Sequence, residues 1–307
     1  MIPMPAPDET YVATLVCDPA LPILTDALLV QAMQALPRVA GGFDWLAKGI
    51  AADILFAPGR GEAGVAVVER VRTALHGQRV DIIVQPRGTR RKTLLIADMD
   101  STIIGQECID ELADFAGVKA HVAAITERAM RGEIAFEPAL RERALLLRGL
   151  STSLVDEVLS ARINLTPGGT TLVRTMRANG AFAALISGGF TLFTSRIAER
   201  VGFDEHRGNL LEIANGSFSG LVAEPILGRQ AKLDTLKELR ARLQLERWQT
   251  LAVGDGANDL AMLGEAGLGV AFRAKPAVAA AAHARIDHAD LTALLYAQGY
   301  RREELVE

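Results

Sequence analysis

Hydrophobic and polar residues alternate along the first third of the chain in blocks that predict strands and helices in turn. Three apolar runs have the character of strands, and two stretches between them carry apolar residues at helical spacing: 11–17, 50–56 and 80–84 for the strands, 22–36 and 61–76 for the helices. A further strand, around Val39 to Trp45, is poorly marked. In the second helix one stripe is expected to face the sheet: Val65, Val68, Val71 and Leu75. We therefore expect most of a β-α-β-β-α-β arrangement in residues 1–88.

A different pattern begins at residue 94. Leu94 to Ala97 form an unbroken apolar run, which is typical of a central parallel strand covered on both faces. Residues 103–163 are rich in Ala, Leu, Glu and Arg without strand-like alternation, and they indicate helices. Helices and strands alternate again from Leu165 onward. The pattern predicts a three-layer, doubly wound parallel-sheet α/β core in residues 93–307, with residues 103–163 inserted as a helical cap.

Composition and charge place the chain among ordinary globular proteins. Its 307 residues, half of them hydrophobic, are enough for a large core and about two domains. The formal net charge of −4 gives no electrostatic footprint for nucleic acid or an anionic membrane, so neither is expected as a partner. One basic cluster lies beside a proline and a glycine, which favours a solvated linker: Arg87, Arg90, Arg91 and Lys92.

The sequence gives no indication of secretion or membrane insertion. Its first ten residues lack both the basic and the apolar region of a secretory signal. No apolar run approaches the length of a membrane span. The two cysteines, Cys17 and Cys108, have no metal-ligand spacing and fit a reducing compartment, so we expect a cytoplasmic protein.

Two carboxylates directly follow the apolar run at 94–97. Asp98 and Asp100 are two positions apart, so in an extended chain both side chains project toward one side of the strand end. Open α/β sheets bind their ligands at this edge. Such a pair can hold a hard divalent cation while one carboxylate attacks phosphorus, although an acidic turn also explains the pair taken alone.

Three further polar signals lie after predicted strands or at the start of a predicted helix. They are the run Ser187, Gly188 and Gly189, the single Lys232, and the glycine-rich turn with Asp255, Asn258 and Asp259. Singly they are explained by an ordinary turn, a solvated lysine, and a plain loop or a fragment of a calcium site. Together, in this order, they indicate phosphoryl transfer.

The four signals resemble those of the haloacid dehalogenase superfamily of phosphohydrolases, from Thr93 to the C-terminal helix. The resemblance implies that Asp98 is the nucleophile, and a carboxylate ionised at neutral pH needs no base to attack. It also implies that Asp100 protonates the leaving alcohol and later activates water. Dehalogenases of the superfamily lack an acid at the position of Asp100, which favours a phosphatase.

The same resemblance implies a Mg²⁺ ion held by the Asp98 side chain, the Asp100 carbonyl and the Asp255 side chain. Lys232 then adds positive charge to the phosphoryl group. The other motif residues are implied to bind phosphate or to orient its neighbours: Ser187, Gly188 and Gly189 on the phosphate, Asn258 beside the substrate, and Asp259 behind the lysine and the metal's waters.

Residues 107–108 and 129–143 resemble the cap of phosphoserine phosphatases, a family within this superfamily. The resemblance implies that Glu107 meets the substrate's ammonium and Arg143 its carboxylate, while Met130 and Phe136 form an apolar wall. Other interpretations stay open: an exposed helix start for Glu107, core packing for Phe136 and a surface ion pair for Arg143.

We therefore expect Mg²⁺-dependent hydrolysis of the small molecule O-phospho-L-serine, the last step of L-serine biosynthesis, through a phospho-Asp98 intermediate. A related phosphatase or phosphotransferase acting on another small phosphomonoester is one alternative. A catalytically inert sensor of serine or phosphoserine is another. The pattern of residues 1–88 resembles the ACT-type regulatory domain without carrying a motif, and the sequence leaves a homodimer open.

Overall fold

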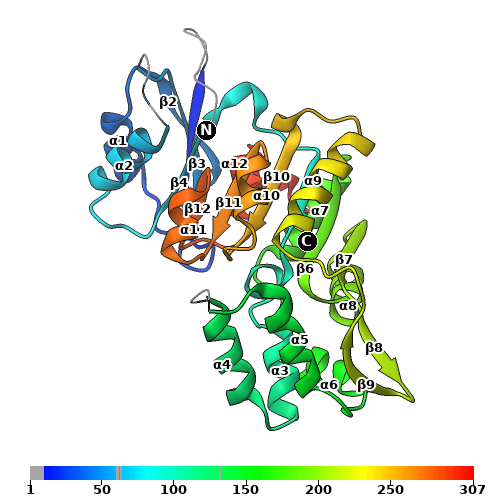
Figure 1. The fold of residues 1–307 in the computed structure, drawn as a ribbon. Helices are drawn as coiled ribbons and strands as arrows, with labels where there is room; N and C mark the ends of the chain where they lie inside the picture. Colours follow the sequence, from blue (N-terminus) through cyan, green and yellow to red (C-terminus); the bar gives the residue numbers. More distant parts are fainter. Residues whose placement is uncertain (1–9, 60–61, 63, 131–132) are drawn as a thin grey trace.

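The computed structural model describes residues 10–59, 62, 64–130 and 133–307, without the side chain of Met130 (Figure 1). The described residues before position 87 form six elements: β1 (Tyr11–Val16), α1 (Asp26–Ala35), β2 (Val39–Ala47), β3 (Ala51–Phe56), α2 (Gly64–Ala74) and β4 (Asp81–Pro86). This is the predicted β-α-β-β-α-β order, with β2 in the poorly marked position.

These strands form one antiparallel sheet in the order β2-β3-β1-β4. The edge strand β2 is largely exposed in its first half, and its register with β3 shifts between Val39 and Phe43. Gly41, in this shifted segment, has a φ of 83°. An exposed, interrupted edge strand carries little hydrophobic alternation, which explains its weak mark in the sequence.

The helices α1 and α2 cover one face of the antiparallel sheet. The predicted stripe of α2 was partly wrong, because Val65 is 66% exposed. Among the described residues the helix starts at Gly64, which places Val65 in the first described turn. The inward stripe instead runs at a spacing of four, from Val67 through Val71 to Leu75.

The rest of the chain is built on a six-stranded sheet in the order β12-β11-β10-β5-β6-β7, with every neighbouring pair parallel. Its strands are β5 (Leu94–Ala97), β6 (Phe182–Phe190), β7 (Glu205–Asn209), β10 (Thr250–Gly254), β11 (Leu268–Phe272) and β12 (Ala284–Ile286). The run at 94–97 is therefore a central parallel strand, as predicted.

Helices cover both faces of the parallel sheet. One layer contains α7 (Gly169–Ala178), α8 (Thr191–Val201) and α12 (Ala293–Ala297), and the other contains α9 (Arg229–Arg242), α10 (Leu260–Glu265) and α11 (Pro276–Ala281). Leu95 and Ala97 of β5 pack with the first layer, and Leu94 and Ile96 with the second, because side chains alternate along a strand. Among the helices described, none has the length and apolar character needed to cross a membrane.

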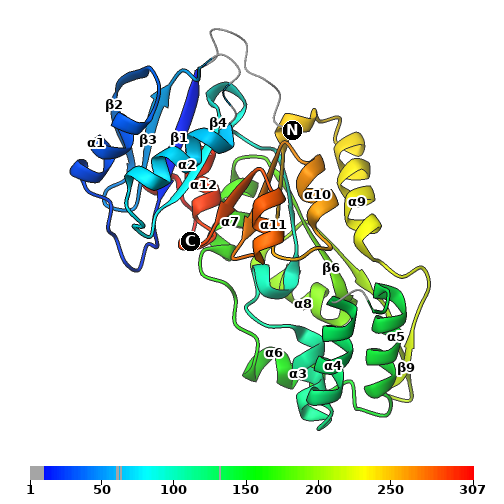
Figure 2. The same ribbon diagram turned by 60° about the vertical axis from the view of Figure 1, so that its left-hand side comes forward.

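Four α-helices lie between β5 and α7 in the described chain and form a separate lobe, the cap, at the carboxyl edge of the sheet (Figure 2): α3 (Cys108–Phe115), α4 (Lys119–Met130), α5 (Phe136–Leu146) and α6 (Leu154–Ala161). A hairpin of β8 (Leu211–Ala214) and β9 (Ser217–Val222) lies beside α5. Its turn is the Asn215-Gly216 pair, with φ angles of 50° and 75°, a pair that is typical of tight hairpin turns.

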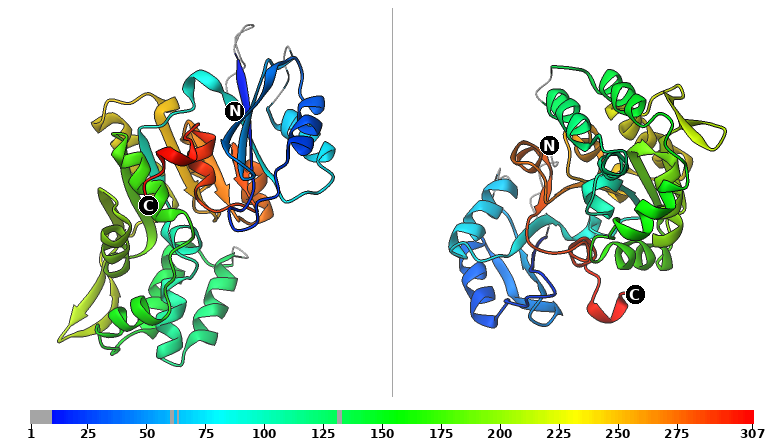
Figure 3. Two further views of the ribbon diagram at one scale, coloured as in Figure 1. Left: turned by 180° about the vertical axis from the view of Figure 1, so that it is seen from behind. Right: turned by 90° about the horizontal axis from the view of Figure 1, so that it is seen from below.

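The antiparallel sheet packs against the core through its second face (Figure 3). The helix α12 contacts both β1 and β3, and Val16 and Ile83 share a hydrophobic cluster with it. The Asp81 carboxylate accepts hydrogen bonds from the main-chain N–H groups of residues 287, 288 and 289, at 2.8, 3.0 and 2.8 Å. Apolar and polar contacts therefore hold the two parts of the chain together.

The basic cluster before β5 is not the solvated linker that the sequence predicted. Lys92 is 4% exposed, and its Nζ donates hydrogen bonds to the carbonyls of Thr89 and Trp248, at 2.7 Å each. Arg90 pairs with Asp53 of β3. Because this segment runs beside the contact between the two sheets, Lys92 is buried and Arg90 half-buried, whereas Arg87 and Arg91 stay exposed. Desolvation lowers the pKa of Lys92 to about 8.

Candidate active site

The carboxyl edge of the parallel sheet gathers three of the predicted residues around a buried ion pair. Asp98 follows β5 directly, and its Oδ1 lies 2.7 Å from the Lys232 Nζ. The same Nζ lies 2.7 Å from the Oδ1 of Asp259. Lys232 is only 2% exposed. The lysine in the first turn of α9 is therefore part of the sheet edge and not a solvated surface residue.

Two glycines let the loop at 254–259 fold tightly on itself. A Cβ at Gly254 would collide with the Asp259 carboxylate, and a Cβ at Gly256 would collide with the side-chain oxygen of Asn258. The Gly256 N–H donates a hydrogen bond to Asp259 Oδ2 at 3.0 Å. This folding directs Asp259 toward the lysine and leaves Asp255 at the edge of the sheet.

Three carboxylates at this edge are crowded together. Oxygens of Asp98, Asp255 and Asp259 all lie within 4.8 Å of one another. Burial, followed by repulsion from Asp259, raises the pKa of Asp98 well above its usual value and that of Asp255 to about 6. Burial disfavours the Lys232 ammonium, but attraction by Asp259 and Asp98 is stronger and raises its pKa. Such excess negative charge fits a hard divalent cation, which carboxylate oxygens bind.

The side chain of Asp100 is held apart from these three carboxylates. Its Oδ1 accepts the Cys108 N–H at 2.9 Å, and its Oδ2 accepts the Ser187 hydroxyl at 3.1 Å. Burial raises the pKa of Asp100, in spite of these hydrogen bonds. A carboxyl group that holds its proton more firmly than usual suits an acid that must donate one.

Residues 187–189 form a bulge in β6. Three residues of β6 stand there opposite a single residue of β7. A bulge re-aims the side chains of a strand, and Ser187 is directed at Asp100 while its Oγ also accepts the Gly189 N–H at 2.8 Å. A Cβ at Gly189 would lie 3.0 Å from the Asp100 carboxylate, so this close approach requires glycine.

The cap reaches the bulge through Phe136, the first residue of α5. A Cβ at Gly188 would lie 3.2 Å from the Phe136 ring, and a Cβ at Gly228 would lie 3.4 Å from it. The ring therefore packs on the main chain of two core segments. The side chain of Met130, the other residue predicted for the apolar wall, lies outside the described part of the structure.

Arg143 lies in the last turn of α5, and among the described residues its guanidinium forms hydrogen bonds only to neutral groups. Its Nε donates to the Ala139 carbonyl and its Nη1 to the Thr126 hydroxyl, both at 3.3 Å. Within the described part of the chain no carboxylate forms an ion pair with it, whereas Arg141 on the same helix pairs with Glu224 at 2.6 Å. A surface ion pair, one interpretation of Arg143 left open by the sequence, is therefore absent among these residues.

Glu107 lies immediately before α3, and its carboxylate accepts the Ser101 hydroxyl at 2.8 Å. The residue is exposed to solvent, which agrees with the open alternative of an exposed helix start, and the surrounding protein nevertheless raises its pKa to about 7 through desolvation and then repulsion from Asp100. Its negative charge also acts on Arg143, whose pKa is lowered by burial against attraction from Asp110 and Glu107. The carboxylate of Glu107 and the guanidinium of Arg143 are therefore close enough to interact electrostatically.

The sequence interpretation missed two buried residues of this region. Thr102 is fully buried, and its hydroxyl donates to Asp255 at 3.4 Å. Thr102 is the last residue of the motif that runs from Asp98 to Thr102, so its place in this motif could have marked it as a site residue. Asn209 is 1% exposed and bonds to Gly188, but its partners are distant in sequence and no local pattern marks it.

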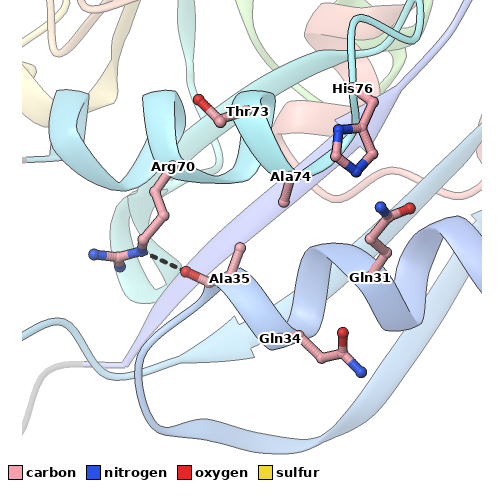
Figure 4. A pocket seen from close by; sticks show the side chains of 7 residues that line it. All are labelled: Gln31, Gln34, Ala35, Arg70, Thr73, Ala74 and His76. Atoms are coloured by element: carbon pink, nitrogen blue, oxygen red, sulfur yellow. Dashed lines mark hydrogen bonds between the residues drawn. The ribbon is translucent and has the colours of Figure 1, made fainter.

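A separate cleft of about 530 Å³ lies between α1 and α2 (Figure 4). Seven residues line it: Gln31, Gln34, Ala35, Arg70, Thr73, Ala74 and His76. The Arg70 guanidinium is already engaged, because its Nε donates to the Ala35 carbonyl at 2.5 Å and its Nη1 to Glu62 at 2.6 Å. This cleft is on the helix-covered side of the antiparallel sheet and contains none of the predicted site residues.

Comparison with known proteins agrees with the geometry of the sheet edge. Residues 95–264 match the family model described as haloacid dehalogenase-like hydrolase. The chain belongs to the haloacid dehalogenase-like hydrolases, and the family together with its relatives supports a phosphoric monoester hydrolase.

Within that family the chain is similar to phosphoserine phosphatases. It is 44% identical over 243 residues to the phosphoserine phosphatase of Streptomyces coelicolor, over 77% of this chain but only 59% of that protein. A probable phosphoserine phosphatase from Vibrio cholerae has the same fold over 99% of this chain and 90% of its own, with a TM-score of 0.75 and 30% identity. A phosphoserine phosphatase solved as a phospho-aspartyl intermediate analogue covers 67% of this chain and 98% of its own, with a TM-score of 0.63 and 36% identity.

Proposed function

We propose that this chain is a phosphoserine phosphatase, which hydrolyses O-phospho-L-serine to L-serine and phosphate. The observation that carries the proposal is the contact of the Lys232 Nζ with both Asp98 and Asp259, beside an Asp100 that is bonded to Ser187. Similarity to phosphoserine phosphatases, one of them solved as a phospho-aspartyl analogue, supports both the substrate and the intermediate.

In the first half of the reaction, an oxygen of Asp98 forms a bond to phosphorus while the bond from phosphorus to the serine oxygen breaks. Asp100 gives its proton to the departing serine oxygen. The ammonium of Lys232, 2.7 Å from the nucleophile, stabilises negative charge on the phosphoryl oxygens. The hydroxyl of Ser187 and the main chain of Gly188 and Gly189 bind those oxygens in this proposal.

In the second half, Asp100 takes a proton from water, whose oxygen bonds to phosphorus as the bond to Asp98 breaks. Phosphate is released and both acids return to their starting states. The raised pKa of Asp100 supports this exchange, since the group must hold a proton for part of the cycle. A second proton carrier is not needed.

The crowded carboxylates support a Mg²⁺ site. Asp98, Asp255 and the main-chain carbonyl of Asp100 would hold the ion, with Asp259 and Asn258 beside it, and when bound it supplies positive charge to the phosphoryl group. The same carboxylate cluster includes Asp259, which the sequence placed behind the lysine. Its 2.7 Å contact with Lys232 favours that supporting role.

The cap supplies the proposed recognition of the amino acid part. Glu107 meets the ammonium group and Arg143 the carboxylate, which its planar guanidinium can bind through two hydrogen bonds. Phe136, packed on Gly188, forms the apolar wall together with Met130. Arg143 forms no ion pair among the described residues, which supports this assignment, because a half-buried cation is stabilised by a carboxylate partner that the substrate would bring.

We also propose the finer assignments of the chain. Residues 1–88 form an ACT-like α+β domain, residues 93–307 the phosphatase core and residues 103–163 its cap, and the element order of the antiparallel sheet supports the first of these. No ligand is assigned to the ACT-like domain. The unpaired state of Cys17 and Cys108 supports a reducing, cytoplasmic setting.

Phosphate release by the full chain with Mg²⁺ tests the function on three substrates. Phosphoserine carries an ammonium and a carboxylate, phosphoethanolamine lacks the carboxylate, and p-nitrophenyl phosphate lacks both. We expect kcat/KM to fall by at least about tenfold for each missing group, because a charged group of the cap then loses its partner. A preference for p-nitrophenyl phosphate would favour another small phosphomonoester. Binding of phosphoserine without any release would favour the inert sensor.

A further inference from the structure

Asn209 is a buried side chain at the end of β7 that forms hydrogen bonds only to the main chain of other segments. Its Nδ2 donates to the Gly188 carbonyl at 2.8 Å and to the Leu227 carbonyl at 3.2 Å. Its Oδ1 accepts the Leu227 N–H at 2.7 Å. Both donors of the amide and its oxygen are therefore engaged.

The bulge at 187–189 explains why the Gly188 carbonyl needs this partner. Three residues of β6 stand there opposite one residue of β7, so the regular ladder between the strands is interrupted. A buried carbonyl without a donor is costly. The side chain of Asn209 supplies the donor and fixes the direction of the peptide between Gly188 and Gly189, next to the proposed phosphate-binding Ser187.

The other partner of Asn209 leads to Lys232. Leu227 and Gly228 immediately precede α9, which begins at Arg229 and carries the lysine in its first turn. One amide thus joins the phosphate-binding bulge to the start of the helix that holds the catalytic ammonium. The distance between these two segments is set by three hydrogen bonds to a single side chain.

The cap closes on these same two segments. The Phe136 ring packs on Gly188 and on Gly228, at the contact distances given above. If the segments moved apart or twisted, the ring would lose the surface on which it lies. By fixing the distance between these two segments, Asn209 also fixes the surface on which the Phe136 ring packs.

We propose that Asn209 is a positioning residue that aligns the phosphate-binding bulge with the start of α9 and with the Phe136 wall. It touches neither the phosphoryl group nor the nucleophile. The inference rests on the proposed phosphatase function only in naming what the bulge binds. The chemistry that Asn209 recognises is main-chain amide, so its substitution acts on geometry and not on charge delivered to the substrate.

Asn209→Leu tests this in the full chain with Mg²⁺, because it removes the donors and the acceptor of the amide at a similar side-chain volume and adds no charge near the phosphate. We expect kcat/KM for p-nitrophenyl phosphate and for phosphoserine to fall by at least about tenfold, since the half-buried carbonyls of Gly188 and Leu227 lose their donor. The inhibition constant of inorganic phosphate should rise by a similar factor. Inorganic phosphate reports on the bulge without any chemical step.

Gln298→Leu is the matched control. Gln298 is likewise fully buried, and its Nε2 donates to the Leu294 carbonyl at 2.9 Å while its oxygen accepts the Lys92 N–H at the opposite end of β5. We expect this variant to lose thermal stability but to keep the wild-type phosphate inhibition constant. An equal loss of phosphate affinity in both variants would assign Asn209 a merely structural role and overturn the proposal.

If Asn209→Leu does not fold, Leu227→Pro removes a single hydrogen bond to Asn209 from a half-buried loop position and should weaken phosphate binding less, in the same direction. Wild-type phosphate affinity in a folded Asn209→Leu or Leu227→Pro variant would overturn the inference. That failure is distinct from failure of the proposed function, which would appear in the wild-type protein as a lack of preference for phosphoserine.

Discussion

Ser187 donates a hydrogen bond to Asp100 at 3.1 Å, across the boundary between the neighbouring strands β5 and β6. The residue proposed to bind phosphate thus holds the residue proposed to transfer the proton. A phosphate oxygen that competes for the Ser187 hydroxyl would leave Asp100 Oδ2 free to face the leaving group. Binding and proton transfer are connected through this one hydroxyl.

Asp98→Asn should lower kcat by about a thousandfold or more while the fold is retained, because an amide cannot form the phospho-enzyme bond. Phosphate release and circular dichroism measure the two properties. Asp44→Asn is the control, since Asp44 is an exposed carboxylate paired with Arg301. Retention of more than a few per cent of the wild-type rate would exclude Asp98 as the nucleophile.

Asp255→Ala should raise the Mg²⁺ concentration for half-maximal activity by at least about tenfold, because it removes one of three clustered carboxylates. A Mg²⁺ titration of phosphate release measures it. Asp234→Ala, on an exposed position of α9, should leave the titration unchanged. An unaltered Mg²⁺ requirement in Asp255→Ala would place the ion elsewhere.

Arg143→Ala should lower kcat/KM for phosphoserine by about tenfold to a hundredfold and change that for p-nitrophenyl phosphate little. Only the first substrate has a carboxylate for the guanidinium. Arg141→Ala is the matched control on the same helix, because that arginine is paired with Glu224 at the surface. Glu107→Gln should shift the substrate ratio in the same direction as Arg143→Ala. Equal losses for both substrates would make Arg143 structural.

His283→Asn should make the protein less sensitive to acid. Burial, followed by repulsion from Arg247, lowers the pKa of His283 from 6.5 to about 4, and its Nδ1 accepts the Gly269 N–H at 3.0 Å. Between these two pH values the unfolded chain binds a proton that the folded chain does not, so stability is lost as the pH falls from 6.5 to 4.

Asparagine retains an acceptor for Gly269 and cannot titrate. The free energy of unfolding, measured with urea at pH 7.5 and pH 4.5, should therefore differ less in His283→Asn, by on the order of 1–3 kcal/mol. His121→Asn, at an exposed position of α4, should keep the wild-type difference. A wild-type pH dependence in His283→Asn would mean that other groups cause the acid sensitivity.

A fragment that starts at Thr93 should still release phosphate, because the proposed catalytic residues all follow that position. It should also melt several degrees lower than the full chain, since α12 loses the apolar cover of Val16 and Ile83. Calorimetry and activity at low temperature measure both. Asp81→Ala in the full chain should give an intermediate loss of stability. A folded but inactive fragment would show that the first domain contributes to the site.

The sequence was sufficient to predict the architecture of the core and the grouping of its polar residues. Parallel strands place their carboxyl ends at one edge, so Asp98, Ser187 and Asp255, each following an apolar run, were expected to meet there. The contact of Lys232 with Asp98 followed from a family order of motifs and not from spacing. No periodicity gives the distance between a strand end and the first turn of a later helix.

The features that the sequence did not predict depend on contacts between distant segments. Lys92 looks solvated beside other basic residues, but its ammonium finds two carbonyls in the contact between the sheets. Asn209 becomes important only because a bulge in β6 removes the ladder partner of Gly188. The true face of α2 depended on where the helix begins, which hydrophobic spacing alone leaves uncertain by a residue or two.

The hairpin of β8 and β9 gives the cap a third attachment besides its two chain connections. Residues 149–152 of the cap bond to it through Gly149 N–H to Phe218 at 2.9 Å, Phe218 N–H to Leu150 at 2.9 Å and Thr152 N–H to Gly216 at 3.0 Å. Because of these hydrogen bonds, the cap cannot move outward by itself. It either moves together with the hairpin or breaks the three bonds. Since the hairpin begins two residues after Asn209, an outward movement of the cap that carried the hairpin along would also act on Asn209 and, through it, on the bulge at residues 187–189.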